Sequence, residues 1–255
     1  MPIGLGVSLG VGGGKPATSG GTPPSGSSFS NTWSADFAEG DEYFTMASTL
    51  DPGEDCTFSA WLYPTDLSSG SCIIGHSGTV SYFYIWSTRQ VGLGGTGQTT
   101  YGTFTNTLVT LDDWNHVVFT KGGTDGRDIV GYINGSETES MTWGTYTNPY
   151  PPFNQIGKYS SSTTNNWNGN MDEIAVWNGT TLSAAQVTSV WNGGAPGDLD
   201  AITGLASPTH WWRMGENNSP SAGVGISAVT DMGTGGNNLT QSTAANQPVA
   251  STSVP

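Results

Sequence analysis

Closely spaced carboxylates are the groups in this sequence that come nearest to a catalytic arrangement. Cleavage of a glycosidic bond needs two carboxyl groups that face the same bond, and two acids at alternate positions of one strand would provide them. The spacing Glu-x-Asp-x-x-Glu does not occur. Asp172 and Glu173 are immediate neighbours, so in a strand we expect them to point to opposite faces. Asp112 and Asp113 fall in an expected turn.

Nucleophilic catalysis has no better support in the sequence. The Gly-x-Ser-x-Gly turn that presents a catalytic serine is missing. His116 lies within "WNHVVF", which reads as a core strand, and we expect it to be a packed or hydrogen-bonded side chain. His and Cys clusters with the spacing of a zinc site are also missing. We therefore predict that the protein is not an enzyme.

The elements that would position any site are mostly β-strands. From Phe29 onward, short runs of β-branched and aromatic residues alternate with turn residues, as in a sandwich. Strands are expected near 33–38, 42–47, 56–63, 72–76, 80–87, 90–94, 99–110, 114–121, 129–134, 153–158 and 170–177, and Asn134-Gly135 predicts a tight hairpin. One short helix is expected near 183–192, with Ser183 as N-cap, Gln186 as its capping-box partner and Gly193 at its end.

The first 14 residues have a different pattern. Aliphatic side chains alternate with Gly or Ser, so an extended strand would have one apolar face and one bare face. These aliphatic residues are Ile3, Leu5, Val7, Leu9 and Val11. We expect 1–14 to be an extended arm that adds to a sheet edge of a partner, followed by a flexible Gly/Pro/Ser linker at 15–28. The alternative is that the arm folds back over its own sandwich.

Charge and composition exclude several classes of protein. Six Lys and Arg against 20 Asp and Glu give a net charge of −14, which argues against nucleic acid as a partner. Glycine or serine interrupts every apolar step of the first segment, so we expect neither a signal peptide nor membrane insertion. Cys56 and Cys72 begin successive expected strands, and we expect two packed thiols without a disulfide. A lysine-poor chain rich in Gly, Thr and Asn favours a surface or virion protein.

Several stretches together resemble one known family. They are "ADFAEGDEYFTMA", "CTFSAWLYP", "DDWNHVVFTKGGTDGRDIVGYINGS", "IGKYSSS" and "WNGNMDEIAVWNGTTLSAAQVTSVWNGG". In this order, over about residues 33–194, they resemble a laminin-G-like domain, which is a concanavalin A-like jelly roll. The resemblance implies an all-β sandwich over 29–207. Such sandwiches include lectins, adhesins, enzymes and structural modules, so the fold does not settle the function.

The C-terminal segment, 208–255, also resembles part of this family. "THWWRMGEN" and the residues after it resemble the segment that usually precedes the first core strand, but here they follow the closing helix. We expect permuted strands that complete the same sandwich, with Trp211 and Trp212 as core and boundary residues. The alternatives are pairing with a neighbouring subunit and a second domain that is cut short.

The resemblance implies a possible metal site. Related sandwiches often hold one Ca²⁺ with a carboxylate and backbone carbonyls. The matching positions are Asp172 and Asp41, with a backbone oxygen near Gly40. No cofactor is required by this interpretation, and a single structural calcium is the one that the resemblance leaves open. The alternative is that Asp172 holds a neighbouring loop by hydrogen bonds.

Glycan binding would need exposed aromatic rings near a rim of the sandwich. The loop "MTWGTYTNPYPP" offers Trp143, Tyr146 and Tyr150. In "VSYFYIW", alternation puts Tyr82, Tyr84 and Trp86 on one face and Phe83 and Ile85 on the other, and one of these two faces must be core. Ordinary packing and subunit contact are the alternatives for these rings.

The glycine-rich start and the linker resemble, in style, structural proteins of tailed phages, especially marine ones. We therefore predict a non-enzymatic virion protein: a capsid decoration, head-fibre or tail-associated module. It would assemble in the host cytoplasm as a homo-oligomer and bind other virion proteins through its arm. The alternative is a secreted or surface lectin-like module that binds cell-surface glycans, with calcium.

Overall fold

The computed structural model describes residues 29–38, 40–78, 81–95, 102–142, 152–158, 165–216 and 220–255. The expected arm at 1–14, the linker at 15–28 and the loop aromatics Trp143, Tyr146 and Tyr150 lie outside these residues. The predictions about the arm and this loop therefore stay predictions.

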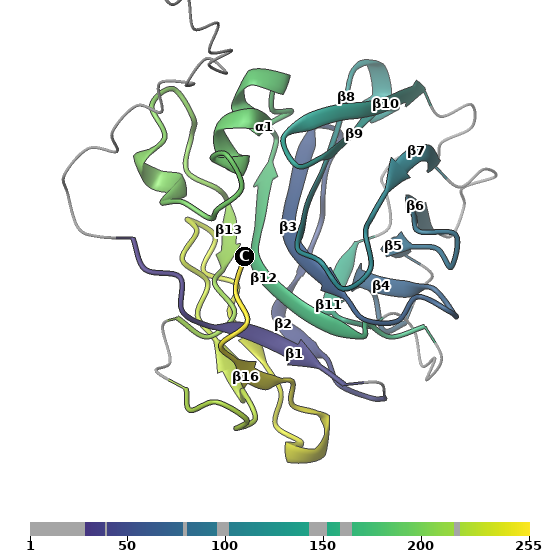
Figure 1. The fold of residues 1–255 in the computed structure, drawn as a ribbon. Helices are drawn as coiled ribbons and strands as arrows, with labels where there is room; N and C mark the ends of the chain where they lie inside the picture. Colours follow the sequence, from purple (N-terminus) through teal and green to yellow (C-terminus); the bar gives the residue numbers. More distant parts are fainter. Residues whose placement is uncertain are drawn as a thin grey trace, which may run out of the picture.

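Two antiparallel sheets stack face to face (Figure 1). Sheet A has the order β10 (Ser136–Thr142), β9 (Asp128–Ile133), β8 (Asn115–Gly122), β3 (Cys56–Pro64), β12 (Gly169–Asn178), β1 (Ser34–Phe37) and β16 (Val249–Ser251), and β13 (His210–Trp212) also pairs with β12. Sheet B has the order β14 (Ala228–Val229), β15 (Leu239–Thr240), β2 (Phe44–Leu50), β11 (Phe153–Ile156), β4 (Ser71–Gly75), β5 (Ser81–Ile85), β6 (Gln90–Gly95) and β7 (Gly102–Leu108). The expected all-β sandwich, a concanavalin A-like jelly roll, is confirmed.

Strand alternation builds the core between the sheets. In sheet B, one side chain from each of five neighbouring strands falls in register and points inward: Phe44, Ile156, Ile74, Phe83 and Leu93. From sheet A, the Phe119 ring meets them, with its centroid 4.7 Å from that of Phe83. Each fully buried side chain of this size contributes roughly 1.5–3 kcal/mol to stability, so this core holds the two sheets together.

The helix α1 (Ala184–Trp191) covers the side of sheet A that faces away from sheet B (Figure 1). Its N-terminus has the predicted capping box between Ser183 and Gln186. At its other end Asn192 already adopts the left-handed conformation (φ 51°), one residue before the expected Gly193. Val187 and Val190 of α1 pack on sheet A in a second apolar cluster, called the outer cluster. Its buried members are Val118, Tyr132, Ala175, Trp177, Leu182, Val187, Val190, Leu199 and Trp211.

Three short 3-10 helices lie in the connections that the structure describes. They are η1 (Thr124–Gly126), η2 (Leu199–Ala201) and η3 (Ala244–Asn246). The predicted hairpin between β9 and β10 is confirmed, since Asn134 (φ 50°) and Gly135 (φ 74°) both have the positive φ that its turn requires.

The C-terminal segment supplies strands to both sheets. β13 and β16 pair with β12 and β1 in sheet A, and β15 pairs with β2 in sheet B and also with β14. Trp212 is fully buried in the core between the sheets, and Trp211 lies in the outer cluster. Residues 208–255 are thus built into the same sandwich.

The two cysteines are buried and free, as expected. The physical reason differs from the expected one: Cys56 begins β3 in sheet A, whereas Cys72 lies on β4 in sheet B. The described helices are all too short or too polar to cross a membrane.

Candidate functional site

Aromatic rings gather on the outer face of sheet B. Phe83 and Ile85 of β5 point into the core, and Tyr82, Tyr84 and the following Trp86 point the other way. This outcome confirms the expected alternation and decides which face is core. The rings contact one another, with centroids 5.5 Å apart for Tyr82 and Tyr84 and 4.9 Å apart for Tyr84 and Trp86. Together with Cys72 they form what we call the aromatic cluster.

Glycines on β6 make room for these rings. Gly94 pairs with Tyr82, and Gly92 pairs with Tyr84. A Cβ atom added to Gly94 would lie 2.6 Å from Cε2 of Tyr82, and one added to Gly92 would lie 2.6 Å from Nε1 of Trp86. Real Cβ atoms do not approach so closely. The rings therefore lie across β6, and glycine in a strand marks this close approach.

A row of uncharged side chains continues the face across sheet B. Gln155 of β11 pairs with Thr45 on one side and with Gly75 on the other, and Gly75 pairs with Tyr82. Directly paired residues project to the same face of a sheet, so this row lies on the outer face. Thr45 is exposed and Gln155 is 7% exposed. The Gln155 Oε1 atom is buried and has no hydrogen-bond partner among the described residues.

Sheet B carries no charge in its strands. Over the described lengths of its eight strands there is no Asp, Glu, Lys, Arg or His. The strands of sheet A contain Asp36, His116, Lys121, Asp128, Glu137, Glu139, Asp172, Glu173 and His210. The described strands of sheet B therefore supply rings, hydroxyl groups, amides, glycine and the Cys72 thiol to its outer face.

The structure overturns the expectation that Asp172 and Glu173 point to opposite faces. Met171 and Ile174, on either side of them, both point into the core between the sheets. The pairing of β12 with β3 shifts between Asp172 and Ala175, and Glu173 has a φ of 47°. This β-bulge places two successive side chains on one face. The two acids, called the carboxylate pair, therefore both lie on the outer face of sheet A.

The carboxylate pair is enclosed and satisfied by protein groups. Glu173 accepts hydrogen bonds from Nε of Arg213 (2.9 Å) and Nε1 of Trp211 (2.6 Å). Asp172 accepts them from Nδ2 of Asn31 (2.9 Å) and from the backbone N–H of Glu173 (2.8 Å). Burial raises the pKa of Glu173 to about 7, although Arg213 acts in the opposite direction. Burial, and secondly the neighbouring Glu173, raises the pKa of Asp172 well above its usual value.

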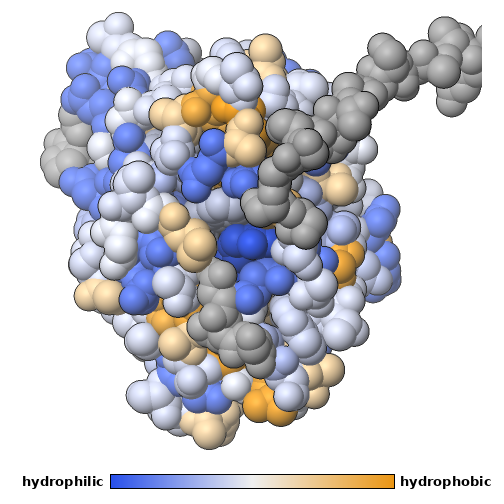
Figure 2. All heavy atoms as spheres, turned by 90° about the vertical axis from the view of Figure 1, so that its left-hand side faces the viewer, coloured by the Kyte–Doolittle hydropathy of each residue, from blue (hydrophilic) through white to orange (hydrophobic). Residues whose placement is uncertain are grey.

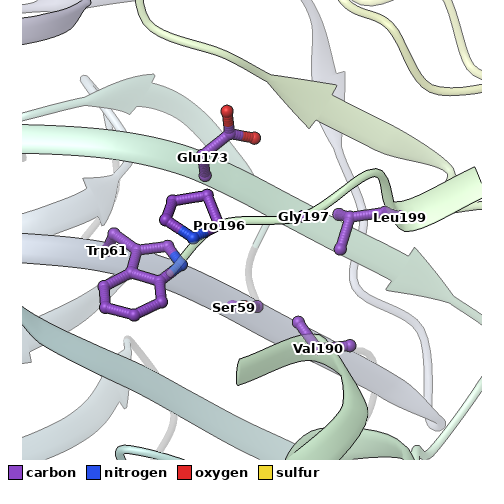
Figure 3. Close-up of a pocket in the computed structure, with 7 residues that line it drawn as sticks. All are labelled: Ser59, Trp61, Glu173, Val190, Pro196, Gly197 and Leu199. Carbon is purple, nitrogen blue, oxygen red and sulfur yellow. The ribbon is translucent and has the colours of Figure 1, made fainter. Parts of the chain in front are cut away.

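Figure 2 shows the side of the molecule that lies on the left of Figure 1, where hydrophilic residues gather near the middle of the face. On the outer side of sheet A, a small cavity lies between β3, β12, α1 and the chain that leads to η2. In Figure 3, Pro196 lies between Trp61 and Glu173. The lining residues are Ser59, Trp61, Glu173, Val190, Pro196, Gly197 and Leu199. The free volume is about 10 Å³, room for about one water molecule, so this cavity cannot admit a sugar or another organic substrate.

His116 lies beside this cavity as a packed histidine, as predicted. Its Nε2 atom lies 2.8 Å from Oγ of Ser59, and its ring packs on Trp61 with centroids 4.9 Å apart. Burial lowers the pKa of His116 to about 3. The imidazole is therefore neutral and is a weak base.

The two predicted calcium ligands have separate partners. Asp41 lies in the turn before β2 and pairs with Lys158, whose Nζ atom is 2.6 Å from its Oδ1 atom. The Gly40 carbonyl accepts a hydrogen bond from Asn166. Asp172 is fully buried on β12, and its carboxylate accepts a hydrogen bond from the side-chain amide of Asn31. Within the described ranges, no three His, Cys, Asp or Glu side chains converge as a metal site would need. Calcium binding stays a prediction.

Comparison with known proteins places the chain in a family. The sequence model of the concanavalin A-like lectin/glucanases superfamily matches residues 38–188. This match covers more than half of the chain. The chain belongs to this family. Among curated proteins, none matches the chain.

Solved structures share the concanavalin A-like fold at low sequence identity. A putative carbohydrate binding protein from Bacteroides ovatus is 18% identical, with a TM-score of 0.56 over 83% of this chain and 58% of that chain. A heptameric SAP-like pentraxin from Limulus polyphemus is 20% identical, with a TM-score of 0.49 over 63% of this chain and 82% of that chain. The CBM40 of a Ruminococcus gnavus IT-sialidase, bound to α2,3-sialyllactose, is 13% identical, with a TM-score of 0.46 over 60% of this chain and 96% of that chain. These likenesses show the fold alone.

Sequence reasoning missed two features of the outer face of sheet B. One is the absence of charge along all of its described strands, which only the pairing of distant segments reveals. The other is the place of Gln155, two strands away from Tyr82. Gly92 and Gly94, at alternate positions of "GLGG", were the sequence feature from which rings lying across β6 could have been predicted. The prediction of a virion role finds no support in the comparisons.

Proposed function

We propose that the protein is a non-enzymatic carbohydrate-binding module that binds its ligand on the outer face of sheet B. The observation that carries this proposal is the chemistry of that face: rings that lie across glycines, beside hydroxyl and amide groups, without a charge in the described strands. Sugars suit such a face, because their C–H surfaces pack on aromatic rings and their hydroxyl groups bond to a few placed polar groups.

Trp86 is the ring of the aromatic cluster that is best placed to meet a ligand. It is partly exposed, whereas Tyr82 and Tyr84 are 5% and 4% exposed. The Tyr84 ring packs edge-on against Trp86, and the Tyr82 ring lies 6.3 Å away from it. These contacts limit the orientations of the Trp86 ring before a ligand arrives. A ring that is already oriented loses less conformational entropy on binding.

Family membership supports the proposal at the level of the superfamily, which includes both lectins and glucanases. The Bacteroides ovatus protein is itself described as a putative carbohydrate binding protein, and it shares the fold. Binding without catalysis is favoured by the carboxylate pair. Asp172 is 0% exposed and Glu173 is 4% exposed, so a substrate has no access to the one place where two acids stand together on β12.

The proposal is tested by glycan-array screening followed by calorimetry with Trp86→Ala. We expect this variant to fold and to lose at least about tenfold in affinity, or roughly 1.4 kcal/mol. Trp114→Ala is the matched control, because Trp114 is also partly exposed and packs edge-on against one tyrosine, Tyr63, but lies at the end of sheet A. Equal affinity of Trp86→Ala and the unaltered protein, or an equal loss in both variants, would contradict binding at this face.

A further inference from the structure

The charges of this protein are distributed unevenly, and the distribution bears on the ligand. Although the chain carries 26 charged residues, 20 acidic and six basic, none lies in the described strands of sheet B. A charged group that moves from water onto an uncharged face loses hydration and gains no partner. A neighbouring carboxylate, Glu139 of β10, accepts hydrogen bonds from Thr105 and Asn106 of β7 and would repel an anion. Sheet B is thus a poor surface for sulfate or carboxylate groups and a suitable one for hydroxyl groups.

The basic side chains of the described residues are mostly held inside the protein. Lys121 donates to the Gly53 and Glu54 carbonyls, Lys158 pairs with Asp41, and Arg213 pairs with Glu173. These three cations would have to leave their present partners in order to bind an anionic ligand. Arg127, which follows η1, is only partly exposed.

Arg89 is the cation closest in sequence to the aromatic cluster. It lies in the turn between β5 and β6, is exposed, and donates its backbone N–H to the Trp86 carbonyl over 2.8 Å. One arginine could pair with a single carboxylate. The net charge of −14 opposes any ligand that carries many negative charges.

We infer that the outer face of sheet B selects uncharged glycans and discriminates against their sulfated, uronic acid and sialylated counterparts. This inference rests on the proposed function and adds the chemical class of its ligand. Binding then depends on ring packing and on hydrogen bonds from neutral groups. The affinity is therefore independent of salt concentration and of Arg89.

Matched pairs of probes test the inference on the full chain. Affinity electrophoresis compares dextran with dextran sulfate, and hydroxyethyl cellulose with carboxymethyl cellulose. Calorimetry compares lactose with 3′-sialyllactose. Each measurement is made at about 50 and 500 mM salt, a range over which screening weakens exposed charge pairs. Arg89→Ala and Trp86→Ala are measured beside the unaltered protein.

The expected result is that at least one neutral probe binds about tenfold or more tightly than its anionic counterpart. Its affinity should be the same at both salt concentrations and in Arg89→Ala, and lower in Trp86→Ala. Tighter binding of an anionic probe, a loss of affinity with salt, or a loss in Arg89→Ala would overturn the inference and leave carbohydrate binding standing. If no probe binds and a wider glycan array is also negative, the proposed function itself fails.

Discussion

Sheet A and sheet B share one core, but their outer faces are built from different side chains. On sheet A, α1 and the chain around η2 pack with Trp211 of β13 in a second apolar layer, and two acids are enclosed on the same face. On sheet B, the rings of β5 lie across glycines of β6, and the described strands carry no charge. The outer face of sheet A is therefore covered by other parts of the chain. The outer face of sheet B carries the aromatic rings and uncharged polar groups on which the proposed ligand would bind.

Buried carboxylates remain on sheet A because each has protein donors: Arg213 and Trp211 for Glu173, and Asn31 for Asp172. The described strands of sheet B contain amides but no Lys or Arg that could pair with a buried carboxylate, and they contain no Asp or Glu.

Removal of the cation beside the carboxylate pair should have the largest effect. Arg213→Ala leaves Glu173 buried with only Trp211 as a donor, and breaking a buried ion pair in this way costs about 3–5 kcal/mol. The check is the free energy of unfolding from denaturant titration.

Lys158→Ala is the matched control for that experiment. Its partner Asp41 has a half-exposed side chain, at 48%, against 4% for Glu173. Lys158 itself is buried, but its removal leaves Asp41 in contact with solvent, so we expect a cost nearer the range of about 0–1 kcal/mol typical of surface pairs. Equal losses in the two variants would show that enclosure of the carboxylate pair has no energetic consequence.

The titration of Glu173 should contribute to the pH dependence of the free energy of unfolding. Its pKa is raised from 4.5 to about 7, so the folded state holds this proton more tightly than the unfolded chain does. This group's contribution to stability is therefore present below about pH 4.5, declines as the pH rises to about 7 and is constant above that. Asp172, whose pKa is also raised, acts in the same direction.

Glu173→Gln removes that titration while it keeps an acceptor for Trp211. The free energy of unfolding of the variant should fall less between pH 4.5 and 7 than that of the unaltered protein. Equilibrium unfolding at several pH values measures both slopes. Parallel curves for the two proteins would refute the assignment to Glu173.

Adding a methyl group under the aromatic cluster should have a moderate effect. Gly94→Ala places a Cβ atom 2.6 Å from the Tyr82 ring, and overpacking of this kind costs about 1–3 kcal/mol. It should also weaken glycan binding, because the Tyr82 ring supports Trp86. Gly78→Ala is the control, since its added Cβ atom would lie 3.6 Å from Cε1 of His76, which is an ordinary contact distance.

Loss of the Gln155 amide should have the smallest effect on stability. Gln155→Met keeps a similar volume and removes an acceptor that has no hydrogen bond within the described part of the chain. A buried acceptor without a partner costs about 1–3 kcal/mol, so the free energy of unfolding should stay unchanged or rise. A decrease of more than about 1 kcal/mol would mean that the amide is satisfied in solution.

Much of the fold could be predicted from local sequence. The alternation in "SYFYI", the capping box of Ser183 and Gln186, and the turn at Asn134-Gly135 all depend on residues close together in the chain. Strand positions followed for the same reason, because a period of two and flanking turn residues specify an extended segment with two faces. Membership of the concanavalin A-like superfamily was also readable from ordered motifs.

Three-dimensional packing alone decided the features that bear on function. The bulge at Glu173 brings both acids to one face, and their donors come from Asn31 and from Trp211 and Arg213, far away along the chain. The uncharged face of sheet B is assembled from eight separate strands. Such contacts depend on which strands become neighbours and in which register, and no periodicity within one segment carries that information.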